Sequence, residues 1–144
     1  MPEKKTIERA KKDKAEGKAP STQAGEFVRE EMEHIREGKH GARSPQQAIA
    51  IGLSKARRAG VDLPPPRKGT TSEATRKNAE RDLKKGRSGK PAKTSAKRSR
   101  ATTKALKREP RSSASKAALS KQAKQAAARR RVRGKTTASR KSTR

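Results

Sequence analysis

The stretch ARSPQQAIAIGLSKARRAG, residues 42–60, contains the local signals that one complete α-helix needs. Ser44 is a preferred N-cap residue, Pro45 suits the first helical position, and Gln47 completes a capping box. Basic residues fill the last turns, where they complement the helix dipole, and Gly60 suits the left-handed position after the end. The sequence therefore predicts a helix between Ser44 and Gly60. Its apolar stripe consists of Ile49, Leu53 and Ala56, flanked by Ala48, Ile51 and Gly52.

The segment before it, residues 21–37, predicts a second amphipathic helix, with Ser21 or Thr22 as the expected N-cap and Gly38 as the expected stop. Two such helices in succession bury their stripes against each other, so residues 21–63 are predicted to form a helical hairpin. Gly52 costs about 1 kcal/mol relative to Ala in mid-helix, which indicates a close approach of the neighbouring helix. The stripe of the first helix consists of Ala24, Phe27, Val28, Glu31 or Met32, and Ile35. The opposite face, expected to be solvated, carries Glu26, Glu30, Glu33 and Glu37.

The rest of the chain divides into segments of simpler composition. Residues 1–20 mix both charges at helical spacing and predict a short, exposed helix with too few apolar residues to dock firmly. Residues 64–72 form a Pro- and Gly-containing linker, and residues 73–86 predict a short helix with a thin apolar face. Residues 87–144 are rich in Lys, Arg, Ala, Ser and Thr and are expected to be mostly disordered, with the Ala-rich part, 113–133, becoming helical when its charges are neutralised. The expected fold is a small all-α protein: a helical hairpin in the N-terminal half followed by a long basic tail.

The overall composition limits how large a core the chain can build. Its 144 residues are 26% hydrophobic, carry a formal net charge of +28, and include Phe27 as the single aromatic residue. Such a chain is expected to be marginally stable alone and to gain order on a ligand or in a homo-oligomer formed through the hairpin. The absence of cysteine excludes disulfides and thiolate chemistry. With neither a secretory signal nor an apolar run of membrane-spanning length, we expect a soluble, cytoplasmic protein.

The positive charge is concentrated in the second half. Residues 1–63 contain 14 Lys or Arg and 10 Asp or Glu, whereas residues 64–144 contain 28 Lys or Arg and 4 Asp or Glu. Such asymmetry is typical of a segment that meets a polyanion. Cations spaced through Ala, Ser and Thr suit contact with a phosphate backbone and the release of its counterions. They do not suit base stacking, which needs aromatic side chains.

We therefore expect nucleic acid as the partner, with duplex DNA preferred over RNA, little sequence preference, no membrane contact and no cofactor. Most cations of the predicted basic surface lie after residue 66. Cations at the end of the second predicted helix, in the hairpin, extend this surface. The cations assigned to this contact are Lys55, Arg57, Arg58, Arg67, Lys68, Lys84, Lys85, Arg87, Lys90, Lys93, Lys97, Arg98, Arg100, Lys104, Lys107, Arg108, Arg129, Arg130, Arg131, Arg133 and Lys135.

Several more specific interpretations have weaker support. The segment SGKPAK, residues 88–93, has some features of a minor-groove hook but lacks arginines on both sides of its glycine, so simple low complexity explains it better. The hairpin could be a helix-turn-helix with Gln46 and Gln47 at adenines, although Gln47 already has a capping role. His34 has Glu30 and Glu37 within one helical turn, but we expect an exposed histidine there rather than a metal ligand. No catalytic motif is present, and we expect a protein that is not an enzyme.

Residues 19–61, APSTQAGEFVREEMEHIREGKHGARSPQQAIAIGLSKARRAGV, resemble a small bacterial family of uncharacterised basic proteins. Its members share an ARSxxQAIAIGLSxARRAG core and a Lys/Arg-rich tail, and they are often labelled DNA-binding or plasmid-stabilisation proteins. The resemblance implies DNA binding but brings no mechanism and no binding residues. The tail is also similar in composition to the C-terminal domains of linker histones.

Two functional hypotheses follow from these patterns. In the first, the protein is located at the bacterial nucleoid. Its tail neutralises DNA phosphates, and the hairpin supplies self-association or positions the tail. In the second, the hairpin is a protein-interaction module of a plasmid-maintenance or stress system, and its acidic face meets a basic partner. Structured RNA or the ribosome is an alternative partner for the tail.

Overall fold

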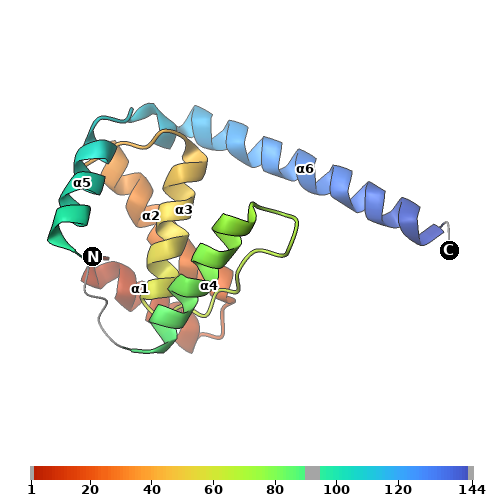
Figure 1. The fold of residues 1–144 in the computed structure, drawn as a ribbon, viewed down its shortest axis with the longest axis horizontal. Helices are drawn as coiled ribbons and strands as arrows, with labels where there is room; N and C mark the ends of the chain where they lie inside the picture. The colour runs from red at the N-terminus through yellow and green to blue at the C-terminus, as the bar shows by residue number, and fades with distance from the viewer. Residues whose placement is uncertain (1, 90–94, 143–144) are drawn as a thin grey trace.

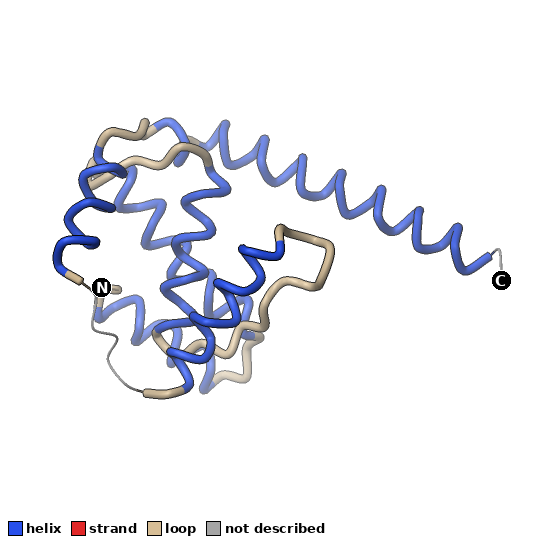
Figure 2. The backbone as a smooth tube through the Cα atoms, viewed as in Figure 1, coloured by secondary structure: helices blue, strands red, loops and turns tan. Residues whose placement is uncertain are grey.

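The computed structural model describes residues 2–89 and 95–142, with side chains described as far as Gly134. The described chain is helical apart from its loops and forms no strand, which confirms the all-α prediction (Figure 2). None of the described helices is both long and apolar enough to span a bilayer. The elements in order are α1 (Lys4–Ala15), α2 (Pro20–Arg36), α3 (Pro45–Arg58), α4 (Glu73–Arg87), α5 (Ala96–Lys107), the short 3₁₀ turn η1 (Ser112–Ala114) and α6 (Lys116–Ser142).

Helices α2 and α3 form the predicted hairpin at the centre of the molecule (Figure 1). Their predicted stripes meet, and Phe27 and Ile35 are fully buried. Gly52 marks the crossing: a Cβ at this position would lie 2.7 Å from the Cα of Val28, so only glycine permits this approach. The close contact predicted from a glycine in mid-helix is confirmed.

The helix ends of the hairpin follow most of the local signals. The Ser44 hydroxyl accepts a hydrogen bond from the Gln47 amide nitrogen at 3.2 Å, as predicted. Gly38 and Gly60 both adopt positive φ after their helices, at 80° and 103°. The start of α2 differs from the prediction, because Ala19 is its N-cap and no side chain caps it. Pro20 at the first helical position fixes the backbone there and moves the start ahead of Ser21.

Helices α1 and α4 pack against the hairpin, α1 against α2 and α4 against α3. The expectation that α1 would not dock is wrong, because Ala10 is buried in one core cluster with Phe27. Ion pairs supplement this small apolar contact, including one from Arg9 to Glu26 at 3.8 Å. The thin apolar face predicted for α4 buries Ala79 and Leu83, as expected.

The second half of the chain is not the disordered tail that composition predicts. It contains α5 and the long helix α6, which projects away from the other helices (Figure 1). Alanine, lysine and arginine are strong helix formers, and the serine before α5 accepts a hydrogen bond from an amide of the first turn. The composition therefore favours local helix even where it cannot supply a buried face.

One short segment attaches these helices to the hairpin. The amide of Gly41 donates to the carbonyl of Leu106 at 2.9 Å, and the amide of Ala42 donates to that of Pro110 at 3.1 Å. Arg111 donates to the carbonyls of Ile35 and Arg36 and so caps the end of α2. Ala114, completely buried, joins the second core cluster together with Leu119. The tail is thus part of the fold between residues 106 and 119.

Candidate nucleic-acid interface

The acidic side chains, and with them the ion pairs, are concentrated in the first part of the described chain. Setting aside Arg133, the ion pairs of the described residues all lie between Glu3 and Arg87. Residues 95–134 contain 14 Lys or Arg and one acid, Glu109. Twelve of the 14 are exposed cations without an ion pair: Lys97, Arg98, Arg100, Lys104, Lys107, Arg108, Lys116, Lys121, Lys124, Arg129, Arg130 and Arg131.

The three hairpin cations do not extend a free basic surface as expected. Lys55 is only partly exposed and pairs with the buried carboxylate of Glu31. Arg57 is buried and donates hydrogen bonds to the carbonyls of Leu63 and Pro64, at 3.2 and 3.1 Å. Burial lowers the pKa of Arg57. Both side chains stabilise the hairpin rather than face a ligand.

The remaining hairpin cation, Arg58, is exposed and lies 4.0 Å from the carboxylate of Asp82 on α4. The α4 cation Arg87 is also engaged, since it donates two hydrogen bonds to Asp62. Arg67 and Lys68 on the linker and Lys84 and Lys85 near the end of α4 are exposed. These four therefore remain compatible with a role in binding, unlike Lys55 and Arg57.

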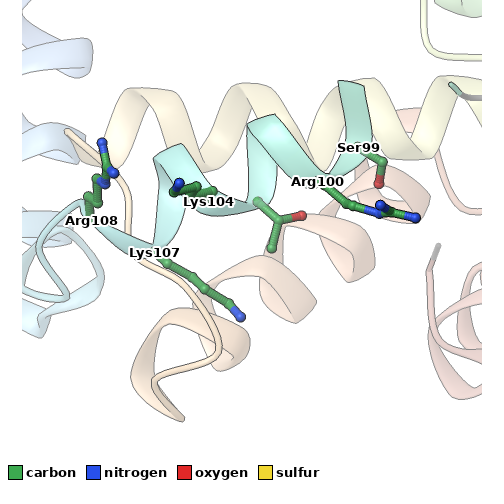
Figure 3. A pocket seen from close by; sticks show the side chains of 6 residues that line it. Ser99, Arg100, Lys104, Lys107 and Arg108 are labelled. Carbon is green, nitrogen blue, oxygen red and sulfur yellow. The ribbon is translucent and has the colours of Figure 1, made fainter. Parts of the chain in front are cut away.

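Helix α5 presents a compact group of exposed cations. Arg100, Lys104 and Lys107 lie within about 60° of one another around the helix, at about 100° per residue. With Ser99, Thr103 and Arg108 they line an open hollow of about 480 Å³ (Figure 3). Sites for small molecules are usually enclosed and largely apolar, whereas this surface combines cations with two hydroxyl groups. Its chemistry suits phosphate oxygens on an extended surface.

Helix α6 offers a second, linear array. It extends for about 40 Å, at a rise of about 1.5 Å for each residue. One turn of duplex DNA is shorter, at about 34 Å. The exposed cations of α6 are distributed around the whole helix, so several face any surface laid along it. Arg133 donates to the Thr70 carbonyl at 3.4 Å, which brings the linker beside the helix.

Three predicted residues cannot be placed by their side chains. Lys90 and Lys93, and with them most of the SGKPAK segment, lie outside the described residues. Lys135 belongs to α6, but its side chain is also outside the described part. Of the two glutamines considered for base contacts, Gln47 is committed to the start of α3, where its side-chain oxygen accepts from the Arg43 amide at 2.6 Å. Gln46 is exposed.

The expectation of a solvated acidic face on α2 is wrong for one of its residues, Glu30, and a neighbouring glutamate is buried with it. The side chains of Glu30 and Glu31 are 3% and 1% exposed. Glu30 accepts from the backbone amide of Glu3 at 3.0 Å, while Glu31 meets Lys55 and His40. One sequence signal indicated this outcome: Glu31 occupies a position of the apolar stripe. The partners come from the segment before α1, from α3 and from the loop between α2 and α3, which local periodicity does not predict.

Of the other acids of this face, Glu33 and Glu37 are exposed and Glu26 is half-buried, but they do not form an unpartnered surface. Glu26 pairs with Arg9, Glu33 with Arg29, and Glu37 with Lys39.

Comparison with known families adds one result. Residues 4–68 match the model of a family of unknown function, DUF6496. This agrees with the resemblance to an uncharacterised family and carries no link to DNA binding or plasmid stabilisation. The matched region covers α1 to α3 and the start of the linker, and it ends before the two basic helices. Neither a curated protein nor a solved structure matches the chain.

Proposed function

We propose that this protein binds duplex DNA through its phosphate backbone, with little sequence preference and without enzymatic activity. The observation that supports this most strongly is the distribution of ion pairs. The acids of residues 3–87 pair with part of the cations around them, whereas the 12 exposed cations of residues 97–131 named above have no acidic partner among the described residues. A cation without an internal partner can replace condensed counterions directly, and their release is the main source of nonspecific affinity for DNA.

In this proposal the two basic helices carry the contact and the helical hairpin anchors them. The α5 face supplies a cluster of phosphate contacts, and α6 supplies contacts along a groove or strand. Ser99 and Thr103 add hydroxyl donors for phosphate oxygens. Base recognition is not part of the proposal, because aromatic stacking residues are missing from the sequence of both helices.

The hypothesis of an acidic docking face has less support. It requires glutamates on α2 that are free to meet a basic partner. Glu30 is buried, and Glu26, Glu33 and Glu37 already pair with cations of this chain. A basic partner would first have to displace these contacts.

The test is a salt titration of the full chain binding to duplex DNA, to a structured RNA of equal length and to single-stranded DNA. The proposal predicts a steep fall of log K with log salt, at about 0.9 per phosphate neutralised on the duplex. It also predicts tighter binding to the duplex than to either competitor at equal salt. Tighter binding to the structured RNA would assign the same surface to RNA. Weak binding with a shallow slope to all three would refute a nucleic-acid function.

A further inference from the structure

We propose that Glu31, His34 and His40 form a binding site for a divalent transition-metal ion, with Zn²⁺ as the best match. The three residues come from α2 and from the loop that connects it to α3. One potential ligand atom of each lies within 4.8 Å of the corresponding atoms of the other two. The expectation of an exposed His34 is wrong, since the side chains of both histidines are only 14% exposed.

The hydrogen bonding of His40 indicates that a cation is needed beside it. Its Nδ1 lies 2.9 Å from the carbonyl oxygen of Gly41. A carbonyl can only accept, so Nδ1 carries the proton. In the neutral ring the Nε2 lone pair then faces the Glu31 Oε2 at 3.2 Å. Two electron-pair donors at this distance repel each other unless a proton or a metal ion lies between them.

The Glu31 carboxylate gives independent support. Its Oε2 atom is buried without a hydrogen-bond partner among the described residues, and the side chain is 1% exposed. Leaving a buried carboxylate oxygen unsatisfied is costly. The other oxygen of the same group binds Lys55, which fixes the carboxylate and leaves Oε2 directed at His40.

The spacing and the donor types suit zinc. Ligand bonds of about 2.0–2.1 Å in a tetrahedral site place neighbouring donor atoms about 3.3 Å apart. This is close to the 3.2 Å between His40 Nε2 and Glu31 Oε2. Imidazole nitrogens favour Zn²⁺ and related ions over Ca²⁺ or Mg²⁺. The Nδ1–H donated to a backbone carbonyl is the usual outer contact of a ligating histidine. With a ring nitrogen of His34 also within 4.8 Å, the set offers three protein ligands and leaves the fourth position for water.

The surrounding charges also favour a divalent cation. His34 Nε2 lies 3.1 Å from Glu3 Oε1 and 3.6 Å from Glu30 Oε1. Glu30, like Glu31, keeps one buried oxygen without a partner among the described residues. Three carboxylates therefore surround the histidines. The nearby cations are Lys55 at Glu31 and Lys39, which lies between Glu3 and Glu37, so negative charge remains uncompensated when both rings are neutral.

The experiment is a titration of the full chain, stripped of metal with a chelator, with ZnCl₂ by calorimetry and with CoCl₂ by visible absorption. The proposal predicts one equivalent of Zn²⁺ and Co²⁺ bands of tetrahedral intensity that Zn²⁺ abolishes. Glu31→Gln and His40→Asn should each weaken Zn²⁺ binding at least about tenfold. Glu33→Gln, which removes an exposed carboxylate of the same helix, is the matched control and should leave the affinity within about twofold.

Three results would overturn the proposal. They are the absence of saturable one-to-one binding to the wild-type chain, only weak octahedral Co²⁺ bands, and unchanged affinity in Glu31→Gln and His40→Asn variants that retain the wild-type helical circular dichroism. The first result, combined with an NMR titration that shows His40 protonated on both nitrogens, would assign its contact with Glu31 to a simple imidazolium–carboxylate pair. The wild-type titrations keep the test decisive if a variant does not fold.

Discussion

Replacing the cations of the α5 face should weaken DNA binding by an amount that can be worked out from the helix geometry. Arg100, Lys104 and Lys107 lie within about 60° of one another, so one duplex surface can meet all three at once. Each phosphate contact contributes about 0.9 to the slope of log K against log salt. The triple variant R100Q/K104Q/K107Q should therefore flatten the slope by about 2.7. If the wild-type chain and the variant bind with equal affinity at about 1 M salt, this slope change corresponds to a loss of affinity on the order of 500-fold at about 0.1 M.

The assay is fluorescence anisotropy of a short labelled duplex, measured over a range of salt concentrations. The matched control is K4Q/K11Q/K14Q, which removes the same charge from three exposed lysines on one face of α1. The control accounts for the general effect of lower net charge. None of these six side chains forms an ion pair in the described structure, so both variants should retain the wild-type fold.

The comparison of the two variants decides whether the reasoning is right. The α5 variant should change the slope by about 2.7, and the α1 control should change it by less than about 0.9, the value of one phosphate contact. Equal losses in the two variants would mean that net charge alone governs binding. An unchanged slope in the α5 variant would remove α5 from the interface, even if the full chain binds DNA tightly.

Three further predictions concern the fold. Gly52→Ala should lower the free energy of unfolding in urea by about 1–3 kcal/mol through overpacking. Gly25→Ala, where a Cβ has no neighbour within 4 Å, should raise the free energy of unfolding by up to about 1 kcal/mol. Changes of the same sign in the two glycine variants would contradict the close helix crossing. Arg111→Gln removes the cap of α2 and should lower the free energy of unfolding by about 1.5 kcal/mol. Hydrogen exchange at the end of that helix should increase, and unchanged exchange would show that the cap is unimportant. The Arg76 guanidinium donates to Glu73 and holds the pKa of that carboxyl below its ordinary value of 4.5. The contribution of this pair to stability is therefore complete above pH 4.5 and is lost as the pH falls below it. In the Glu73→Gln variant, the free energy of unfolding should fall less steeply as the pH is lowered into the acid range. An identical pH dependence in wild type and variant would show that this pair does not contribute.

The central hairpin could be predicted because its signals are local. The start of α3 at Ser44, its end at Gly60 and its close contact at Gly52 each depend on residue types within a few positions. The apolar stripes of α2 and α3 differ from their surroundings in periodicity. No other predicted helix offers an apolar stripe of comparable length. Local chemistry and the tertiary fold therefore agree in this part of the chain.

The burial of charged residues could not be predicted in the same way. Acids are rarely buried without partners, so the sequence predicts a solvated Glu30. The partners of Glu30 and Glu31 include the amide of Glu3 and the side chains of Lys55 and His40, which come from other segments. Such pairing depends on the assembled fold, and it places Glu31, a residue of the predicted apolar stripe, in the candidate metal site.

The docking of the second half of the chain also depends on contacts distant in sequence. Arg111 reaches carbonyls 75 and 76 residues away, and a Cβ at Gly41 would lie 1.9 Å from the Glu109 carbonyl oxygen. Backbone groups supply most of this contact, and contacts made by backbone groups cannot be predicted from amino-acid composition. Low hydrophobicity correctly indicates a small core but does not exclude a helix attached by a few hydrogen bonds.

This mode of attachment has a consequence for electrostatics. If the basic helices were held to the hairpin by ion pairs, binding DNA would require those pairs to be broken, and part of the counterion gain would be lost. Arg111 instead contacts carbonyl groups, and Ala114 and Leu119 make apolar contacts. The segment between α5 and α6 is thus attached to the hairpin without neutralising the cations of the two helices. A basic surface held in this way loses less conformational entropy on binding than a disordered tail of the same charge, so the ordered tail strengthens the proposal of DNA binding.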